Sequence, residues 1–387
     1  MEGVTLKIQL NSKSNNQGYN WLAGQVLGQV LGLVKEPILL CRLFLVCAVI
    51  CVLSSKGFAQ SAAAQELSAG QERKVVVVLG AAGDDSYGDQ FKNWAERLKQ
   101  VIDASRTENP NLKLVRVGGK SETDGQRDGK QKAQTDLALL EKEIESALAQ
   151  TQELWIILIG HGTDDGTSSK FNLRGPDLTA KQLSQWLAPL PCRCVIVNCS
   201  SASGSFINKL KSEDRIVVTA TKSSAQYNFA RFGEHFLQAI GDPAFDLDKD
   251  QQISLLEAFV AGSKRTQEFY EQEGRLATEL AVIDDNGDGL GTPADWFEGT
   301  RAVRKPKQGL PDGLVANQMF LIRRGAESKL SIAQRRSRDE LEAKLESIRL
   351  RKDALGPDEY CRELEPVLIE LARIYQAIEG PSVNQSE

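Results

Sequence analysis

Short hydrophobic runs alternate with amphipathic stretches between residues 74 and 240. Five runs are continuous and rich in β-branched residues, which is typical of strands buried on both faces: Lys74–Gly80, Leu112–Gly119, Leu154–Ile159, Cys194–Asn198 and Arg215–Thr221. The stretches between and after them repeat apolar residues at helical spacing: Gln90–Ile102, Ala133–Leu148, Asp177–Pro191, Ser203–Lys211 and Phe229–Ile240. Five strand–helix repeats predict an α/β fold with a mostly parallel sheet between layers of helices.

The pattern changes after residue 240. Two acidic loops occupy residues 246–257 and 284–295, and a helix is predicted between them over Ser254–Tyr270. Charged helices with apolar stripes follow from about Ala326, and Gly356 and Pro357 divide them into a helical hairpin. The predicted parts are an N-terminal extension, an α/β domain, an acidic-loop pair, a linker and the hairpin: residues 1–65, 72–242, 243–300, 301–325 and 326–380. The hairpin is interpreted as a packing or dimerisation element, or as a pro-segment over the cleft.

The N-terminal extension carries an apolar run, Leu43–Leu53, preceded by Lys35 and Arg42. Small residues follow near Ala59 and Ala64, which is the pattern of a cleaved secretory signal. The run is shorter than the roughly 20 residues that span a bilayer. We therefore expect an exported protein, periplasmic or secreted; an uncleaved N-terminal anchor is the alternative and the only membrane contact predicted.

Composition narrows the function classes only slightly. The 387 residues are 41% hydrophobic and 26% charged, with a formal net charge of −5. That is enough apolar residue for a sizeable core. The sequence has no concentrated basic charge of the kind that marks a nucleic-acid surface, so no nucleic-acid partner is predicted.

The chain has two histidines, and one of them ends a predicted strand. His161 and Gly162 follow the third strand, and Cys199 follows the fourth. Carboxyl ends of neighbouring parallel strands meet at one edge of a sheet, where ligands bind. An imidazolium or a helix N-terminus lowers the pKa of a thiol and makes it a nucleophile. The pattern predicts a Cys–His dyad, with the backbone amides of Gly162 and Cys199 as donors to an oxyanion.

Two stretches, "LWIILIGHG" and "CVIVNCSSASGSF", resemble the caspase/legumain clan of cysteine peptidases, and legumain most of all. The resemblance covers about residues 74–240. It implies a caspase-like αβα sandwich and a cysteine endopeptidase acting on a protein or peptide substrate, or a transamidase or peptide ligase. The sequence departs from legumain in placing "SSA" between Cys199 and Ser203, and in having Asn198 before the cysteine. A structural His161 and a buried, inert Cys199 are the alternative.

Both acidic loops resemble EF-hand calcium loops, which place ligands at positions 1, 3, 5, 7, 9 and 12. The first loop supplies Asp246, Asp248, Asp250, Gln252, Ser254 and Glu257 at these positions, with Gln251 in place of the usual glycine at position 6. The second offers Asp284, Asn286, Asp288, Leu290 and Asp295. Solvated helix caps are the alternative. We expect Ca²⁺ in a structural role.

The remaining candidate residues carry weaker signals. Cys192, Cys194 and Cys361 allow a disulfide in an exported protein but do not require one, and His235 is interpreted as a structural residue. The prediction is an exported cysteine endopeptidase with calcium loops. The alternative from another class is an inactive caspase-like fold that acts as a calcium-binding interaction module.

Overall fold

The computed structural model describes residues 72–119, 134–148, 151–304 and 311–379. The predicted signal and N-terminal extension therefore lie outside the described residues. All described residues belong to one compact unit, residues 66–387. No helix in the described ranges is long and apolar enough to cross a bilayer.

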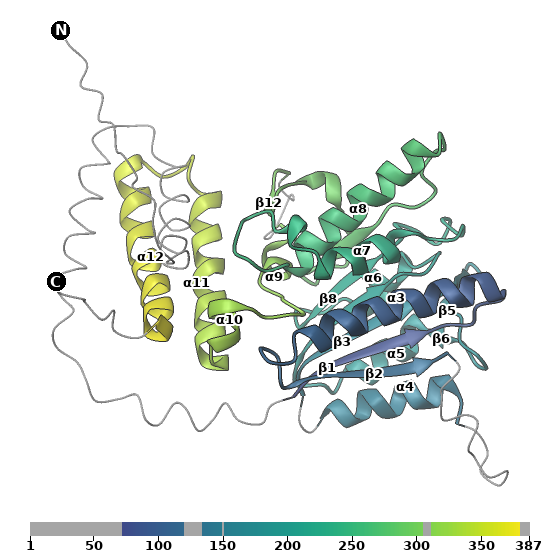
Figure 1. Cartoon of the computed structure of the whole chain (residues 1–387). Helices are drawn as coiled ribbons and strands as arrows, with labels where there is room; N and C mark the ends of the chain where they lie inside the picture. The colour runs from purple at the N-terminus through teal and green to yellow at the C-terminus, as the bar shows by residue number, and fades with distance from the viewer. Residues whose placement is uncertain (1–71, 120–133, 149–150, 305–310, 380–387) are drawn as a thin grey trace, which may run out of the picture. The chain divides into compact units, whose positions relative to one another are not determined.

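A seven-stranded sheet forms the centre of this unit (Figure 1). Its strand order is β10-β9-β8-β7-β3-β1-β2. The bounds are β1 Glu72–Leu79, β2 Leu112–Gly118, β3 Thr151–Ile159, β7 Arg193–Asn198, β8 Arg215–Thr219, β9 Val282–Asp284 and β10 Thr292–Pro293. The first five of these are parallel, as predicted, and β9 and β10 add an antiparallel edge.

Helices cover both faces of the sheet, so the fold is a three-layer αβα sandwich. Because successive strand residues point to opposite faces, Val75 and Val77 pack on one side and Val76 and Val78 on the other. The first face carries α3 Asp85–Ala104 and α7 Phe232–Gly241, with α8 Leu255–Gln272 packed on α7. The second face carries α4 Asp136–Glu145, α5 Ala180–Leu187 and α6 Ser205–Leu210.

Short elements connect these layers. Thr179 begins α5 with a reciprocal capping box to Gln182. A small three-stranded sheet lies between His161 and α5, and the sequence pattern did not predict it because strands of two or three residues leave no periodicity. The bounds of the short elements are β4 Gly162–Asp164, β5 Ser169–Phe171, β6 Leu178–Thr179, β11 Phe297–Glu298, β12 Arg301–Ala302, η2 Ser146–Leu148, η3 Pro243–Phe245 and η4 Ala294–Trp296.

The segment after α7 is part of the same unit, which differs from the predicted organisation. β9 pairs with β8, so the acidic-loop pair extends the main sheet across the expected boundary at residue 242. Residues 312–324, which we term the strap, are packed against the fold where a linker was expected. The strap contains α9 Leu314–Asn317 and a run of four buried hydrophobic residues, Met319, Phe320, Leu321 and Ile322.

The helical hairpin is present as predicted. It consists of α11 Ile332–Leu350 and α12 Pro357–Glu379, which pack on each other, preceded by α10 Gly325–Lys329. Buried Glu327 of α10 forms ion pairs with Arg335 and Arg338 of α11.

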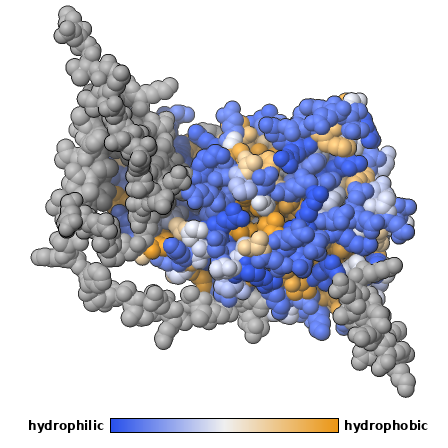
Figure 2. All heavy atoms as spheres, in the orientation of Figure 1, coloured by the Kyte–Doolittle hydropathy of each residue, from blue (hydrophilic) through white to orange (hydrophobic). Residues whose placement is uncertain are grey.

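Hydrophilic residues dominate the face shown in Figure 2, with hydrophobic residues in small groups.

Candidate active site and acidic loops

His161 and Cys199 lie just beyond the carboxyl ends of adjacent parallel strands. β3 pairs with β7 in a register that places Leu158 opposite Asn198. The Cys199 amide continues this ladder by donating to the Leu158 carbonyl at 2.9 Å. Cys199 belongs to the cluster on the α3 and α7 face, and the His161 ring contacts α3. The two candidate residues therefore lie at one edge and on one face of the sheet.

Aromatic rings surround the His161 imidazole. Its centroid is 4.9 Å from that of Tyr87, 5.3 Å from Phe91 and 5.8 Å from Phe229. Nε2 lies 3.1 Å from the Ala82 carbonyl, which can only accept, so Nε2 carries the proton and Nδ1 keeps its lone pair. Burial lowers the pKa of His161 below its usual range, and the neutral imidazole can take up a proton.

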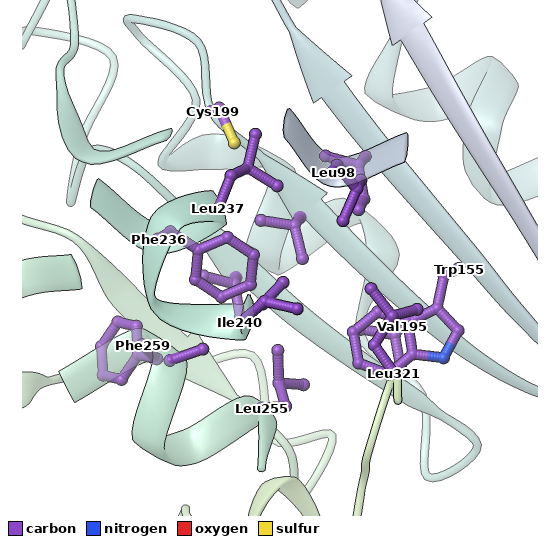
Figure 3. Packing of buried hydrophobic residues seen from close by; sticks show 14 of the residues in the cluster. Leu98, Trp155, Val195, Cys199, Phe236, Leu237, Ile240, Leu255, Phe259 and Leu321 are labelled. Carbon is purple, nitrogen blue, oxygen red and sulfur yellow. The ribbon is translucent and has the colours of Figure 1, made fainter. Parts of the chain in front are cut away.

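Cys199 is 1% exposed and packs against the first turn of α7. A Cβ atom on Gly233 would lie 2.6 Å from Cys199 Cβ and 3.0 Å from Sγ, so only glycine fits there. Figure 3 shows Cys199 beside Leu237 in this packed cluster. Burial, followed by the negative charge of Glu279, raises the pKa of the thiol. The thiol is protonated in this arrangement.

One aromatic cluster connects the two candidate residues. Trp94 lies 6.0 Å from Phe91 and from Phe229 between ring centroids, and both of those rings contact His161. Trp94 also lies within 3.2 Å of the Cβ position of Gly233, which packs on Cys199. The hydrogen bond of the His161 ring is the one from Nε2 to Ala82, and within the described residues no hydrogen bond joins the imidazole to the thiol.

Gly162 packs tightly against the turn that follows Cys199. A Cβ atom at Gly162 would lie 2.2 Å from the Ser201 carbonyl oxygen and 2.7 Å from Ser200 Oγ. The Gly162 amide donates to Ser201 Oγ at 3.3 Å, while the Cys199 amide is used by the sheet. Of the two predicted oxyanion donors, Gly162 is the one whose present partner is a hydroxyl that can rotate away.

Two features of the Cys199 turn differ from what the sequence suggested. Asn198, unexpected before the cysteine, accepts from the Ser200 amide at 3.1 Å and shapes the turn. The helix whose start packs on Cys199 is α7, and not α6, which is the next helix along the chain. α6 begins at Ser205 and buries its side chains on the opposite face of the sheet.

Sequence reasoning missed the residues that enclose the dyad. Tyr87 and Trp94 come from α3, Phe229 from the segment just before α7, Gly233 from the first turn of α7, and Glu279 from the connection before β9. For the residues on α3 and α7, the helical spacing predicted only that the side chains are buried. No signal in the sequence placed Phe229 or Glu279 beside a strand end about 30 or 80 residues earlier, because that proximity arises from the sheet topology.

The first acidic loop brings its three aspartates together. Carboxylate oxygens of Asp246, Asp248 and Asp250 lie within 4.8 Å of one another. Asp246 accepts from the amides of Asp250 at 3.0 Å and Gln251 at 2.9 Å. Gln251 has a φ of +67°, the left-handed conformation for which calcium loops use glycine at position 6. Gln251 therefore adopts the conformation of the usual glycine at this position.

The charges of this loop fit a divalent cation. Glu257, at position 12, reaches back to the loop start and accepts from the Leu247 amide at 2.6 Å. Burial, and then repulsion from Asp248, raises the pKa of Asp250 to about 8, and burial raises the pKa of Glu257 as well. Crowded carboxylates of this kind are stabilised by a bound Ca²⁺. The Gln252 side chain accepts from the Arg324 amide of the strap at 3.0 Å, which leaves its backbone carbonyl for position 7.

The second acidic loop shares the turn but not the predicted last ligand. Asp284 accepts from the amides of Gly287 at 2.8 Å and Gly289 at 2.9 Å, while Asn286 and Asp288 cap the amides two residues ahead. Gly289, at position 6, has a φ of +79°.

The position-12 residue of the second loop lies elsewhere than predicted. Asp295 sits in η4, is 65% exposed and pairs with Arg304 at 3.4 Å, because no full helix follows the loop to bring it back. Asp312 of the strap accepts instead from the amides of Asp285 at 3.1 Å and Asn286 at 3.3 Å. Burial, and then the charge of Asp312, raises the pKa of Asp284 to about 6. The side chain of Leu290 is exposed and has no ligand atom. Only the backbone carbonyl of Leu290 could contact a cation.

The other candidate residues lie away from the dyad. Cys192, Cys194 and Cys361 are free thiols in the described structure, so the disulfide alternative is absent there. Cys192 and Cys194 are buried with the helices of the second face. His235 lies on α7 and burial lowers its pKa, which agrees with a structural residue.

Comparison with known proteins gives little further guidance. No protein-family model and no curated protein matches the chain. Among solved structures, the chain is similar to caspase-1 from Spodoptera frugiperda, with a TM-score of 0.34 and 7% sequence identity. The alignment covers 57% of this chain and 88% of the caspase chain. A likeness this slight carries no argument about the site.

Proposed function

We propose that the protein is a cysteine endopeptidase that uses Cys199 as nucleophile and His161 as general acid–base. The supporting observation is the placement of both residues on one face, beyond the carboxyl ends of paired strands β3 and β7. The proposed reaction begins when Nδ1 of His161 takes the thiol proton and the sulfur attacks a peptide carbonyl. His161 then protonates the leaving amine, and water releases the acyl group.

Opening of the site has to precede this reaction. Cys199 is 1% exposed and its thiol is protonated, and Phe229 packs against His161. A substrate can reach the sulfur only after Phe229 and the start of α7 move. The Gly162 amide must also leave Ser201 Oγ before it can donate to an oxyanion.

Thiol labelling tests this proposal. A peptide carrying an electrophilic ketone should label the wild-type protein at Cys199, and Cys199→Ala should lose both the label and cleavage of a peptide library. Cys361→Ala, which removes a partly exposed thiol away from the dyad, is the matched control and should label normally. Equal labelling of wild type and Cys199→Ala would contradict the proposal.

A second candidate function has its own support. A fully buried, protonated thiol is also what an inactive fold would contain. The protein would then act through its acidic loops, as a calcium-binding interaction module. Labelling distinguishes the two, because the inactive fold should bind calcium without reacting at Cys199.

We further propose that both acidic loops bind Ca²⁺, through Asp246, Asp248, Asp250 and Glu257 in the first, and through Asp284 with Asp312 in the second. Cation binding to the folded state alone raises stability with concentration. Asp246→Ala combined with Asp284→Ala should therefore lower the melting temperature in millimolar calcium but not in chelator.

A pair of conservative variants checks the second loop separately. Asp312→Asn should reduce the calcium-dependent rise in melting temperature, whereas Asp295→Asn, which changes an exposed side chain, should leave it unchanged. The same calcium response in every variant would contradict bound calcium at these carboxylates.

A further inference from the structure

Glu279 is a buried carboxylate whose hydrogen bonds converge on the start of α7. It lies in the connection from α8 to β9 and is 6% exposed. Its oxygens accept from the Arg231 amide at 2.8 and 3.0 Å and from the Phe232 amide at 3.1 Å. The Tyr270 hydroxyl of α8 donates to it at 3.0 Å. Burial raises the pKa of Glu279, and the hydrogen bonds from Arg231, Phe232 and Tyr270 oppose that rise. Because these partners are all donors, they fit the ionised carboxylate.

The same helix start packs on Cys199. Gly233, one residue after Phe232, would bring a Cβ atom to within 3.0 Å of the Cys199 sulfur. The N-terminal end of a helix stabilises a nearby thiolate, because its free amides carry partial positive charge. Glu279 uses two of those amides and adds a negative charge close to the thiol. Both effects favour the protonated, unreactive sulfur.

Glu279 also fixes the segment that closes the site. The residue whose amide it binds, Arg231, stacks its guanidinium on Phe269 at 4.3 Å and lies 5.7 Å from the Phe229 ring centroid. Phe229 in turn contacts His161. A carboxylate that holds residues 231 and 232 therefore holds Phe229 against the imidazole.

We propose that Glu279 is a positioning residue that holds segment 229–232 over the candidate dyad and keeps Cys199 unreactive. This proposal rests on the proposed function only in taking Cys199 as the nucleophile. Thiol reactivity can be measured without a substrate. The substrate, or a partner that displaces Glu279 from the α7 amides, would free those amides and open the route to the sulfur together.

The other groups around Cys199 do not supply a negative charge that disfavours the thiolate. Beyond the end of β3 lies His161, which is neutral; α3 contributes Trp94, which has no charge. Just before α7, the Arg231 guanidinium is stacked on Phe269, and Glu234 and His235 follow within the helix. Tyr270 of α8 donates to Glu279. Of these groups, Glu279 is the one whose charge acts against the Cys199 thiolate.

Alkylation of the full chain with iodoacetamide, located by mass mapping, tests the inference. Glu279→Gln removes the charge and turns an amide NH₂ toward backbone donors. We expect alkylation of Cys199 at a fixed pH to rise about tenfold, which corresponds to a midpoint about one pH unit lower. Glu273→Gln, an exposed glutamate in the same connection, is the matched control and should not change the rate.

Two internal readouts keep the outcome clear. Cys192 and Cys194 are buried on the opposite face and should stay protected, so their alkylation would report unfolding instead. If Glu279→Gln unfolds, Tyr270→Phe removes one hydrogen bond from Glu279 and keeps its charge; it should raise the Cys199 rate with little change in midpoint.

An unchanged Cys199 rate and midpoint in folded Glu279→Gln, or an unchanged rate in Tyr270→Phe where Glu279→Gln is unfolded, overturns the inference. A responsive Cys199 in a protein that cleaves no peptide would refute the peptidase proposal and leave the role of Glu279 standing. Peptide cleavage together with a Cys199 alkylation rate that does not respond to the Glu279 variant would support the peptidase proposal and refute the role of Glu279.

Discussion

Replacing His161 with alanine should lower the kcat of peptide cleavage by about 10²–10⁴-fold, the usual contribution of a general acid–base group. The thiol of Cys199 is protonated and the imidazole neutral, so the attack needs His161 to accept the proton. Alanine also removes the group that protonates the leaving amine. Steady-state kinetics on a peptide identified by library cleavage measures the loss.

The second histidine provides the control for this measurement. His235→Gln changes a structural residue on α7 and should keep most of the activity. In the wild type, cleavage should fall as the pH drops through the His161 pKa, because imidazolium cannot accept a proton. Burial lowers that pKa, so the fall should lie below the ordinary value near 6.5. Equal losses in both variants would argue against a catalytic His161.

Replacing Glu153 with glutamine should lower the free energy of unfolding by about 3–5 kcal/mol, the typical cost of breaking a buried ion pair. Glu153 lies at the amino end of β3 between Arg323 of the strap and Arg73 of β1, and Arg73 is 3.3 Å away. The Trp155 indole also donates to it at 2.6 Å. Glutamine leaves the buried Arg73 and the partly buried Arg323 without their nearest counter-charge. Denaturant unfolding at neutral pH measures the change.

An exposed ion pair supplies the comparison. Glu363→Gln removes the partner of Arg351 on the hairpin and should cost no more than about 1 kcal/mol. Burial alone would raise the pKa of Glu153, but Arg323 and Arg73 outweigh it and lower the pKa to about 2. This contribution to stability is thus complete at neutral pH and should be lost as the pH falls from about 4 toward 2. Similar losses in the free energy of unfolding for Glu153→Gln and Glu363→Gln would contradict the stabilising role of the buried Glu153 ion pairs.

The main sheet was predictable because its strands are buried on both faces. Runs such as Lys74–Gly80 and Leu154–Ile159 are continuous and β-branched, and they form β1 and β3 nearly as predicted. The short strands β4 to β6 and the edge strands β9 and β10 were not predicted, since two or three residues define no period. β9 pairs with β8 from about 65 residues further along the chain, a contact set by tertiary packing.

The candidate site was predictable only for the residues that directly follow a strand in the sequence. His161 and Cys199 each come directly after a buried run, and their pairing follows from strand order. The groups that set their pKa values come from elsewhere: Phe229 and Glu279 approach from segments whose sequence indicates no more than burial or a loop. In the second acidic loop, Asp312 of the strap contacts the loop amides and Asp295 does not, because the strap and not a following helix covers that loop.

The strap joins parts of the molecule that the sequence presents as separate. Ala316 donates its amide to Asp285 at 2.7 Å in one acidic loop, Arg324 donates to Gln252 at 3.0 Å in the other, and Arg323 pairs with Glu153 at the amino end of β3. Free energies that pass through a shared segment act in both directions. A protease cut inside residues 312–324 should therefore release the C-terminal helices and weaken both loops in a single event.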